Sequence, residues 1–181
     1  MRKIILVVIV ILLLAGCSSQ RGLSRADLCV QRVEDKAQIC YGMERAEVEK
    51  VAGKGEIAPH GKYLIYNNGL AVNYRDKAVS LIYITEGDYY EHVSGAKIGD
   101  LPDELRKKYG TASVDGQGIR DGSIAYDYDL KNKKLLKIDD RKNLPTHEQP
   151  ENFITLGVLL DGNGYIDLLA VGDLRAYLTG K

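Results

Sequence analysis

Two short segments of the sequence share one pattern of residues, and this repeat limits the folds open to the chain more than any other feature. The first runs from Gly42 to Gly53 and the second, 57 residues later, from Gly99 to Gly110. Each reads as glycine, four residues, glutamate, valine or leucine, four residues and glycine. The second copy also has Pro102 near its start, acidic residues early and basic residues late. Because glycine commonly follows the last helical residue, the repeat predicts two short helices.

Alternating hydrophobic segments follow each predicted helix. After the first copy, strands are expected at 63–66, 70–74 and 79–84, joined by turns as an antiparallel meander. After the second copy, they are expected at 124–128, 153–160 and 165–171, with 135–138 as a candidate partner of 124–128. The pattern predicts an α+β fold of two tandem helix-plus-antiparallel-meander units, with the helices packed on one face of the sheet or sheets. The first unit, with a preceding helix, spans 24–95, and the second spans 96–181.

The segment before the repeat predicts one more helix and a possible disulfide. Ser24 and Asp27 form a capping pattern, followed by apolar residues at helical spacing, so we expect a helix over 24–36. If this helix stops at Lys36, Cys29 and Cys40 can just come within bridging distance; if it continues through Cys40, the gap is about 16 Å and no bridge can form. A catalytic thiol is the less favoured alternative, because no histidine lies near either cysteine in the sequence.

The amino-terminal segment is typical of a secretion signal. Arg2 and Lys3 precede an apolar run from Ile4 to Ala15, which as a helix of about 18 Å is too short to span a bilayer comfortably. Leu14, Ala15, Gly16 and Cys17 resemble the lipobox of bacterial lipoproteins, with an ordinary cleaved signal as the alternative. The resemblance implies cleavage after residue 16, three acyl chains on Cys17, and a lipidated tether over 17–23. Ser18 and Ser19 resemble the residues of lipoproteins sent to the outer membrane, facing the periplasm.

Charge and motif content argue against several function classes. Lys and Arg total 25, as do Asp and Glu, so nucleic-acid binding is not expected. No catalytic residues, metal ligands or cofactors are predicted, because the three histidines are isolated and no nucleophile motif occurs. The turn at Asp161 resembles the middle of a calcium loop but lacks its first carboxylate and its final glutamate, so we expect a hairpin turn there. Gly53-Lys54-Gly55 lacks the strand and helix that a dinucleotide site needs.

Tyrosine dominates the aromatic residues, with twelve tyrosines against one phenylalanine and no tryptophan. Tyr83, Tyr89 and Tyr90 lie close in sequence, near His92 and the junction between the units. Tyrosine is common both on half-buried sheet faces and on binding surfaces. The cluster therefore indicates either sheet packing or an exposed interaction patch.

The order of these features resembles a known family. The lipobox, the helix that ends at Gly53, and the strands over 69–74 and 79–82 are similar to those of BamE-like outer-membrane lipoproteins. The tandem arrangement also resembles the beta-lactamase inhibitory protein. The resemblance implies a non-catalytic scaffold that binds an envelope protein in assembly, scaffolding or inhibition, although it identifies no partner. The alternative is a lipid-anchored protein that binds or hydrolyses a small molecule or cell-wall fragment.

Overall fold

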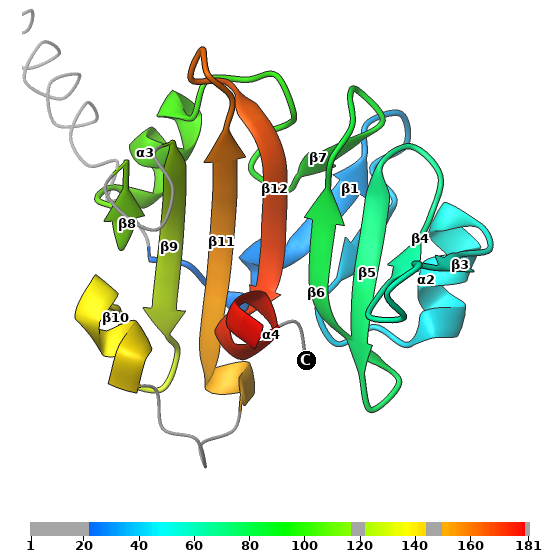
Figure 1. Cartoon of the computed structure of the whole chain (residues 1–181), viewed down its shortest axis with the longest axis horizontal. Coiled ribbons are helices and arrows are strands. Elements are labelled where there is room, and N and C mark those ends of the chain that lie inside the picture. The colour runs from blue at the N-terminus through cyan, green and yellow to red at the C-terminus, as the bar shows by residue number, and fades with distance from the viewer. Residues whose placement is uncertain (1–21, 117–121, 144–149, 180–181) are drawn as a thin grey trace, which may run out of the picture.

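The computed structural model describes residues 22–116, 122–143 and 150–179 and has an α+β architecture of two antiparallel sheets and a few short helices (Figure 1). The large sheet has the strand order β10-β9-β11-β12-β6-β5-β4-β3, and β8 also pairs with β9. The small sheet has the order β2-β1-β7. The α+β class expected from the sequence is confirmed. Among the residues described, no helix is both long enough and apolar enough to span a bilayer.

The strands are short, and most are joined to their neighbours in sequence by tight turns. Those of the large sheet are β3 (Glu56–Ile57), β4 (Leu64–Ile65), β5 (Leu70–Arg75), β6 (Ala78–Ile84), β8 (Val114–Asp115), β9 (Ser123–Asp129), β10 (Lys134–Leu135), β11 (Phe153–Leu160) and β12 (Ile166–Asp173). The small sheet contains β1 (Cys29–Arg32), β2 (Gln38–Cys40) and β7 (Tyr90–His92). The helices are α2 (Arg45–Ala52), α3 (Asp103–Tyr109) and α4 (Leu174–Thr179), with 3-10 turns η1 (Arg25–Asp27), η2 (Ile138–Asn143) and η3 (Pro150–Asn152).

The two glycine-bounded segments form the helices α2 and α3. α2 ends before Gly53, which has a φ of +81°, and α3 ends before Gly110, which has a φ of +77°. In this left-handed region a residue with a Cβ is disfavoured, so glycine is the residue that can follow each helix at low cost. Each helix buries one central aliphatic side chain in the main core, Val48 in α2 and Leu105 in α3.

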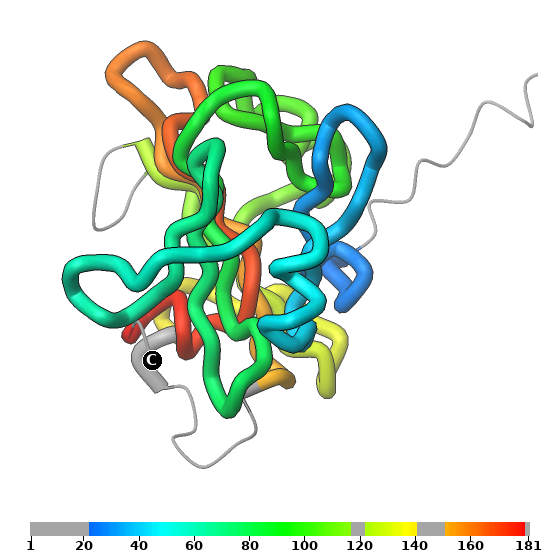
Figure 2. The backbone as a smooth tube through the Cα atoms, turned by 90° about the vertical axis from the view of Figure 1, so that its right-hand side faces the viewer, coloured from blue at the N-terminus to red at the C-terminus, as the bar shows by residue number. Residues whose placement is uncertain are grey.

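The two halves of the chain are joined by strand pairing. β6 from the first half pairs with β12 from the second in antiparallel register, with Ile82 opposite Val171 and Ile84 opposite Leu169. These four side chains are buried in the same core, which lies between the large sheet and the layer formed by the small sheet, α2 and α3. In Figure 2, β1 and β2 of the small sheet (blue) and α2 (cyan) lie on one side of the large sheet.

α2 and α3 pack on one face of the large sheet, whereas α4 was not expected from the sequence and lies on the other face. α4 packs on the opposite face, where Ala176 meets Leu81 and Ala170 in a smaller apolar cluster (Figure 1). Gly157 in β11 allows this approach, because a Cβ there would lie 3.0 Å from the hydroxyl oxygen of Tyr177. Asp173 fixes the start of the helix, since its Oδ1 accepts the backbone N–H of Ala176 at 2.7 Å.

The helix expected over 24–36 is wrong. The capping pattern exists, because Asp27 Oδ2 accepts hydrogen bonds from the backbone N–H and the hydroxyl of Ser24, but it caps a single 3-10 turn. Cys29–Arg32 then forms β1, which pairs with β2 on one side and β7 on the other. Pairing on both edges satisfies the backbone of this segment and buries Val30 completely, which outweighs its local preference for helix.

Candidate functional site

The hairpin formed by β3 and β4, residues 56–65, is an exposed apolar part of the surface and is called the edge hairpin below. Ile57 in β3 is 74% exposed and Ile65 in β4 is 43% exposed. Leu64, which lies opposite Ile57 in the register, is buried. Because side chains alternate along a strand, Ile65 points to the face opposite that of Leu64. The edge hairpin therefore presents one exposed isoleucine on each face of the sheet.

A pocket lies on the face of the sheet that also carries α4, and we call it the front pocket. Its volume is about 560 Å³. Tyr63 and Tyr83 meet there with ring centroids 6.3 Å apart, and Leu168, Ala71 and Ile65 complete its apolar lining. Burial raises the pKa of the Tyr83 phenol to about 12, so its hydroxyl is protonated at physiological pH. The front pocket thus offers aromatic and aliphatic surface from tyrosine, isoleucine, alanine and leucine side chains.

A second pocket, the helix-side pocket, lies on the other face of the edge hairpin, next to the start of α2. Its volume is about 460 Å³, and Ile57, Tyr63, Leu64 and Tyr74 supply its apolar lining. The hydroxyl of Tyr74 is hydrogen-bonded to that of Tyr66 at 2.7 Å, and burial raises the pKa of Tyr74. The polar lining comes from the side chains of Glu44, Arg45, Lys62 and Lys77. Tyr63 lines both pockets and so connects the two faces of this edge.

A buried polar cluster joins the small sheet to α3. His92 is fully buried, and its Nε2 donates to the backbone carbonyl of Asp27 at 2.7 Å. Its Nδ1 accepts the backbone N–H of Ser94 at 3.1 Å and lies 2.6 Å from the Ser94 hydroxyl. Tyr109 from α3 donates its hydroxyl to Asp27 Oδ1 at 2.8 Å.

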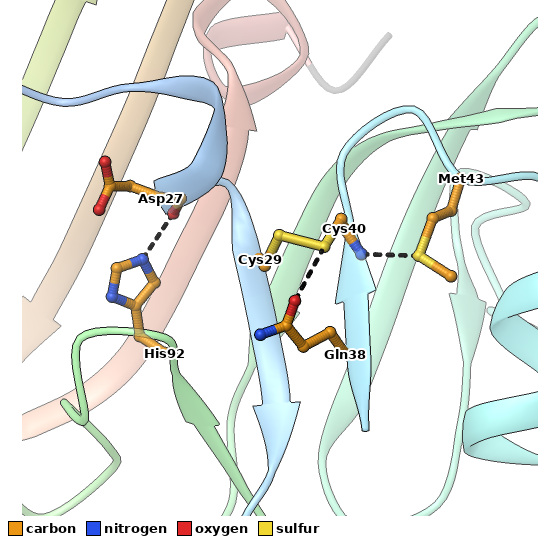
Figure 3. The surroundings of a disulfide bond; sticks show 6 residues. All are labelled: Asp27, Cys29, Gln38, Cys40, Met43 and His92. Atoms are coloured by element: carbon orange, nitrogen blue, oxygen red, sulfur yellow. Dashed lines mark hydrogen bonds between the residues drawn. A yellow bond between two sulfur atoms is a disulfide. The ribbon is translucent and has the colours of Figure 1, made fainter. Parts of the chain in front are cut away.

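This cluster resembles a catalytic triad in residue type but not in geometry. Nε2 of His92 faces a carbonyl of Asp27, not its carboxylate (Figure 3). Burial lowers the pKa of His92 to about 4, so the ring is a weak base at neutral pH. The geometry holds η1, β7 and α3 together and does not activate the Ser94 hydroxyl as a nucleophile.

Cys29 and Cys40 form a disulfide (Figure 3). They lie directly opposite each other in the β1–β2 register, with Cα atoms 4.1 Å apart. The bridge therefore depends on the pairing of β1 with β2 and not on the end of a helix at Lys36. Both sulfur atoms are committed to it, so neither residue offers a thiol for nucleophilic chemistry.

The structure separates the three tyrosines of the predicted patch. Tyr83 lies in the front pocket, whereas Tyr89 and Tyr90 lie at β7 in the small sheet, with their rings packed edge to face at 5.0 Å. Tyr90 is buried, so it packs in the core and offers no contact surface. Sequence reasoning missed Tyr63 and its two exposed isoleucine neighbours, although the alternation over 63–66 already placed Tyr63 and Ile65 on one face. Cys17 lies outside the described residues.

The turn at Asp161 uses its carboxylate within the hairpin. Asp161 Oδ1 accepts the backbone N–H groups of Asn163 at 2.8 Å and Tyr165 at 2.9 Å, and these hydrogen bonds lower its pKa. The turn connects β11 to β12, as the sequence pattern predicted. Within the described ranges, no group of three or more His, Cys, Asp or Glu side chains is placed to hold a metal ion.

Comparison with known proteins gives little further information. No protein-family model matches the chain, and no curated protein matches it. Among solved structures, it is similar to a DUF4309 family protein, YjgB, from Bacillus subtilis, with a TM-score of 0.41 and 14% sequence identity. The match covers 72% of this chain and 78% of that one.

Proposed function

We propose that the chain is a lipoprotein of the bacterial cell envelope, anchored through Cys17, whose α+β domain binds another envelope protein without catalysing a reaction. The outer membrane, with the domain in the periplasm, is the proposed location. The single observation that supports protein binding is the edge hairpin, which exposes Ile57 and Ile65 and has a pocket on each face.

The edge hairpin has the properties of a small contact surface. Tyrosine and isoleucine side chains bury a large apolar area with little loss of side-chain entropy, and tyrosine is enriched at residues that dominate binding energy. Within the described part of the chain, β3 pairs with β4 alone and is the last strand of the sheet. A partner that covered this edge could place apolar side chains in the pockets on both faces, where Tyr63 would contact them.

The tandem organisation is part of the same proposal. α2 and α3 each end at a glycine and each precede antiparallel strands, which supports two related units whose strands share one sheet. The order of the strands places β3 and β10 at opposite ends of this sheet. Seven strand spacings separate them, or about 34 Å. A partner at β3 would therefore bind well away from β10.

A small-molecule binder is the second candidate, because both pockets fall within the size range of ligand sites. The front pocket is mostly apolar, and the phenol of Tyr83, whose pKa burial raises to about 12, is a poor general base at neutral pH. This favours binding over hydrolysis. Thermal melting with soluble cell-wall fragments separates the candidates, since a ligand of the pockets would raise the melting temperature and a protein-binding edge would not respond.

The lipid anchor is tested at the amino terminus of the mature protein. Mass spectrometry should find Cys17 as the first residue with three acyl chains, and Cys17→Ala should release the protein or leave an uncleaved precursor. An unmodified amino terminus at another residue would disprove the anchor.

Protein binding is tested by photo-crosslinking in the cells that produce the chain. A photoreactive residue replaces Ile57 or Ile65, and Glu104, exposed on α3, is the matched control position. We expect one adduct of defined mass from positions 57 and 65, no such adduct from position 104, and a strong loss of the adduct when Tyr63 is changed to alanine. A melting temperature close to that of the unmutated protein would show that Tyr63→Ala is folded. An equal yield of adduct from position 104, or a yield from positions 57 and 65 that Tyr63→Ala does not change, would contradict the proposal.

A further inference from the structure

The turn between β9 and β10 and the segment after it, residues 131–138, form a second exposed surface, which we call the basic hairpin. Lys131, Lys133, Lys134 and Lys137 are exposed on it. Leu135 and Ile138 lie among them and are 36% and 41% exposed. Two acidic residues follow, Asp139 and Asp140, and Asp140 Oδ2 accepts the backbone N–H of Lys137. The surface therefore combines a net positive charge with two exposed aliphatic side chains.

The basic hairpin is held in place by buried contacts. Leu136 is buried beside Phe153 and Leu174, and its backbone N–H donates to the carbonyl of Asp127 at 2.8 Å. The turn itself is closed by Asp129, whose carboxylate accepts the backbone and side-chain N–H groups of Asn132. Its lysines are thus presented from a fixed backbone. Within the described ranges, Lys133, Lys134 and Lys137 form no ion pair.

The described chain begins next to this surface. Gly22 packs so closely on the ring of Tyr128 that an added Cβ would lie 2.7 Å from it, and Leu23 is buried. Tyr128 lies opposite Leu135 in the β9–β10 register. In Figure 1 the chain accordingly starts (dark blue) beside β9 and β10. The point at which the tether joins the domain is therefore beside the basic hairpin.

The length of the tether limits how far this surface can be from the lipid. Four residues lie between Cys17 and Gly22, and the five residue steps from one to the other span at most about 18 Å when fully extended. With Cys17 acylated, Gly22 is confined to this distance from the headgroups, and the basic hairpin lies beside Gly22. Lysine attraction to an anionic leaflet acts over a Debye length of about 8 Å at physiological ionic strength, which this tether allows the basic hairpin to reach.

We propose that the basic hairpin rests on an anionic lipid surface, with its lysines at the headgroups and Leu135 and Ile138 at the interface. The inference rests on the proposed lipid anchor at Cys17. It orients the domain, because β10 then faces the bilayer while β3 and the edge hairpin lie at the other end of the sheet. Exposed lysines that surround aliphatic side chains are the chemistry that recognises an anionic bilayer.

The test uses the full lipidated protein, reconstituted on vesicles of phosphatidylcholine alone or of phosphatidylcholine mixed with phosphatidylglycerol. In Leu135→Cys, position 135 supplies a free thiol in addition to the acylated Cys17 and the disulfide, so an environment-sensitive fluorophore can be attached there. Ile57→Cys at the far end of the sheet is the matched control. We expect blue-shifted emission and quenching by nitroxide-labelled lipid at position 135 on the mixed vesicles, weaker effects on phosphatidylcholine, and none at position 57.

The charge dependence is tested by changing Lys133, Lys134 and Lys137 together to glutamate in the labelled protein. This change should abolish the blue shift while the protein still floats with the vesicles. All three residues are exposed, so the glutamate variant should fold. If it does not, the variant with glutamine at the same three positions is used instead, and it should weaken the blue shift.

The two proposals fail in distinguishable ways. If the protein floats with the vesicles but the fluorophore at position 135 shows no more blue shift or quenching than the one at position 57, the role of the basic hairpin is overturned and the anchor is not. Equal quenching on both vesicle compositions, or quenching at position 57, also overturns it. A protein that does not float overturns the anchor and this inference with it.

Discussion

Acidification should destabilise the protein through the buried ring of His92. The neutral ring uses both nitrogens, since Nε2 donates to the carbonyl of Asp27 and Nδ1 accepts the backbone N–H of Ser94. A protonated ring would point a second N–H at the backbone N–H of Ser94, in a fully buried position. Burial, with a smaller contribution from Lys108, therefore lowers the pKa of His92 from 6.5 to about 4.

The size and sign of the effect follow from this shift. The unfolded chain binds a proton at His92 near pH 6.5, whereas the folded protein does so only near pH 4. Stability is therefore unaffected by His92 above about pH 7, falls as the pH drops from 6.5 to 4, and changes no further below that. At 1.36 kcal/mol for each unit of pKa, the free energy of unfolding should fall by about 3 kcal/mol from this residue alone.

Urea denaturation of the purified protein at a series of pH values between 8 and 4 measures the effect. His92→Gln removes the titrating ring and keeps a donor for the Asp27 carbonyl. Its free energy of unfolding should differ from that of the wild type at neutral pH. Between pH 7 and pH 4, however, the free energy of unfolding of this variant should fall by about 3 kcal/mol less than that of the wild type. The exposed His60→Gln is the matched control and should follow the wild-type curve. If the curves of the wild type and His92→Gln ran parallel from pH 7 to pH 4, the buried neutral histidine would be refuted.

Three further predictions test other parts of the fold. Leu105→Ala on α3 should lower the free energy of unfolding by about 3 kcal/mol, because it leaves a cavity in the core. The control Glu104→Ala, at an exposed position of the same helix, should change this free energy by less than about 0.5 kcal/mol. Chemical denaturation compares the two variants, and similar values would contradict the packing of α3 in the core. Asp173→Ala should lower the free energy of unfolding by about 3 kcal/mol, because Asp173 is buried, caps α4 and accepts hydrogen bonds from the two terminal guanidinium nitrogens of Arg75, at 2.5 and 3.3 Å. Hydrogen exchange of this variant should show faster opening of α4 than of the sheet, and uniform protection would contradict a local role of Asp173 in holding α4. Calcium should leave the melting temperature unchanged, because the Asp161 carboxylate is committed to backbone N–H groups; a rise that Asp161→Ala abolishes would reveal a real site.

Much of the local structure could be predicted because it depends on neighbouring residues. The glycines after α2 and α3, the apolar runs that form β5, β6, β9, β11 and β12, and the turn at Asp161 are all patterns of neighbouring residues. Such patterns fix where an element starts and stops and which side chains share a face. Val48 and Leu105 occupy the same position in the two glycine-bounded segments, and both are buried.

The candidate site was less predictable, because it depends on which face of the sheet is left uncovered. Tyr83 could be identified as a candidate from sequence, but its partner Tyr63 lies 20 residues earlier, directly before β4, and the two rings meet only in the folded sheet. Tyr90, adjacent to Tyr89 in sequence, is instead buried by the pairing of β7 with β1. Closeness in sequence did not predict closeness in the fold.

By itself the sequence determined the α+β class, the two glycine-ended helices, most of the strands, and the pair of cysteines available for a bridge. The tertiary structure decided that 29–32 is a strand and not a helix, that β6 pairs with β12 to join the two halves, and that α4 covers the opposite face. The physical reason is the range of the interactions. Helix caps and turns are satisfied by residues three or four positions away, whereas a strand gains most of its stability from backbone hydrogen bonds and side-chain contacts to strands distant in sequence.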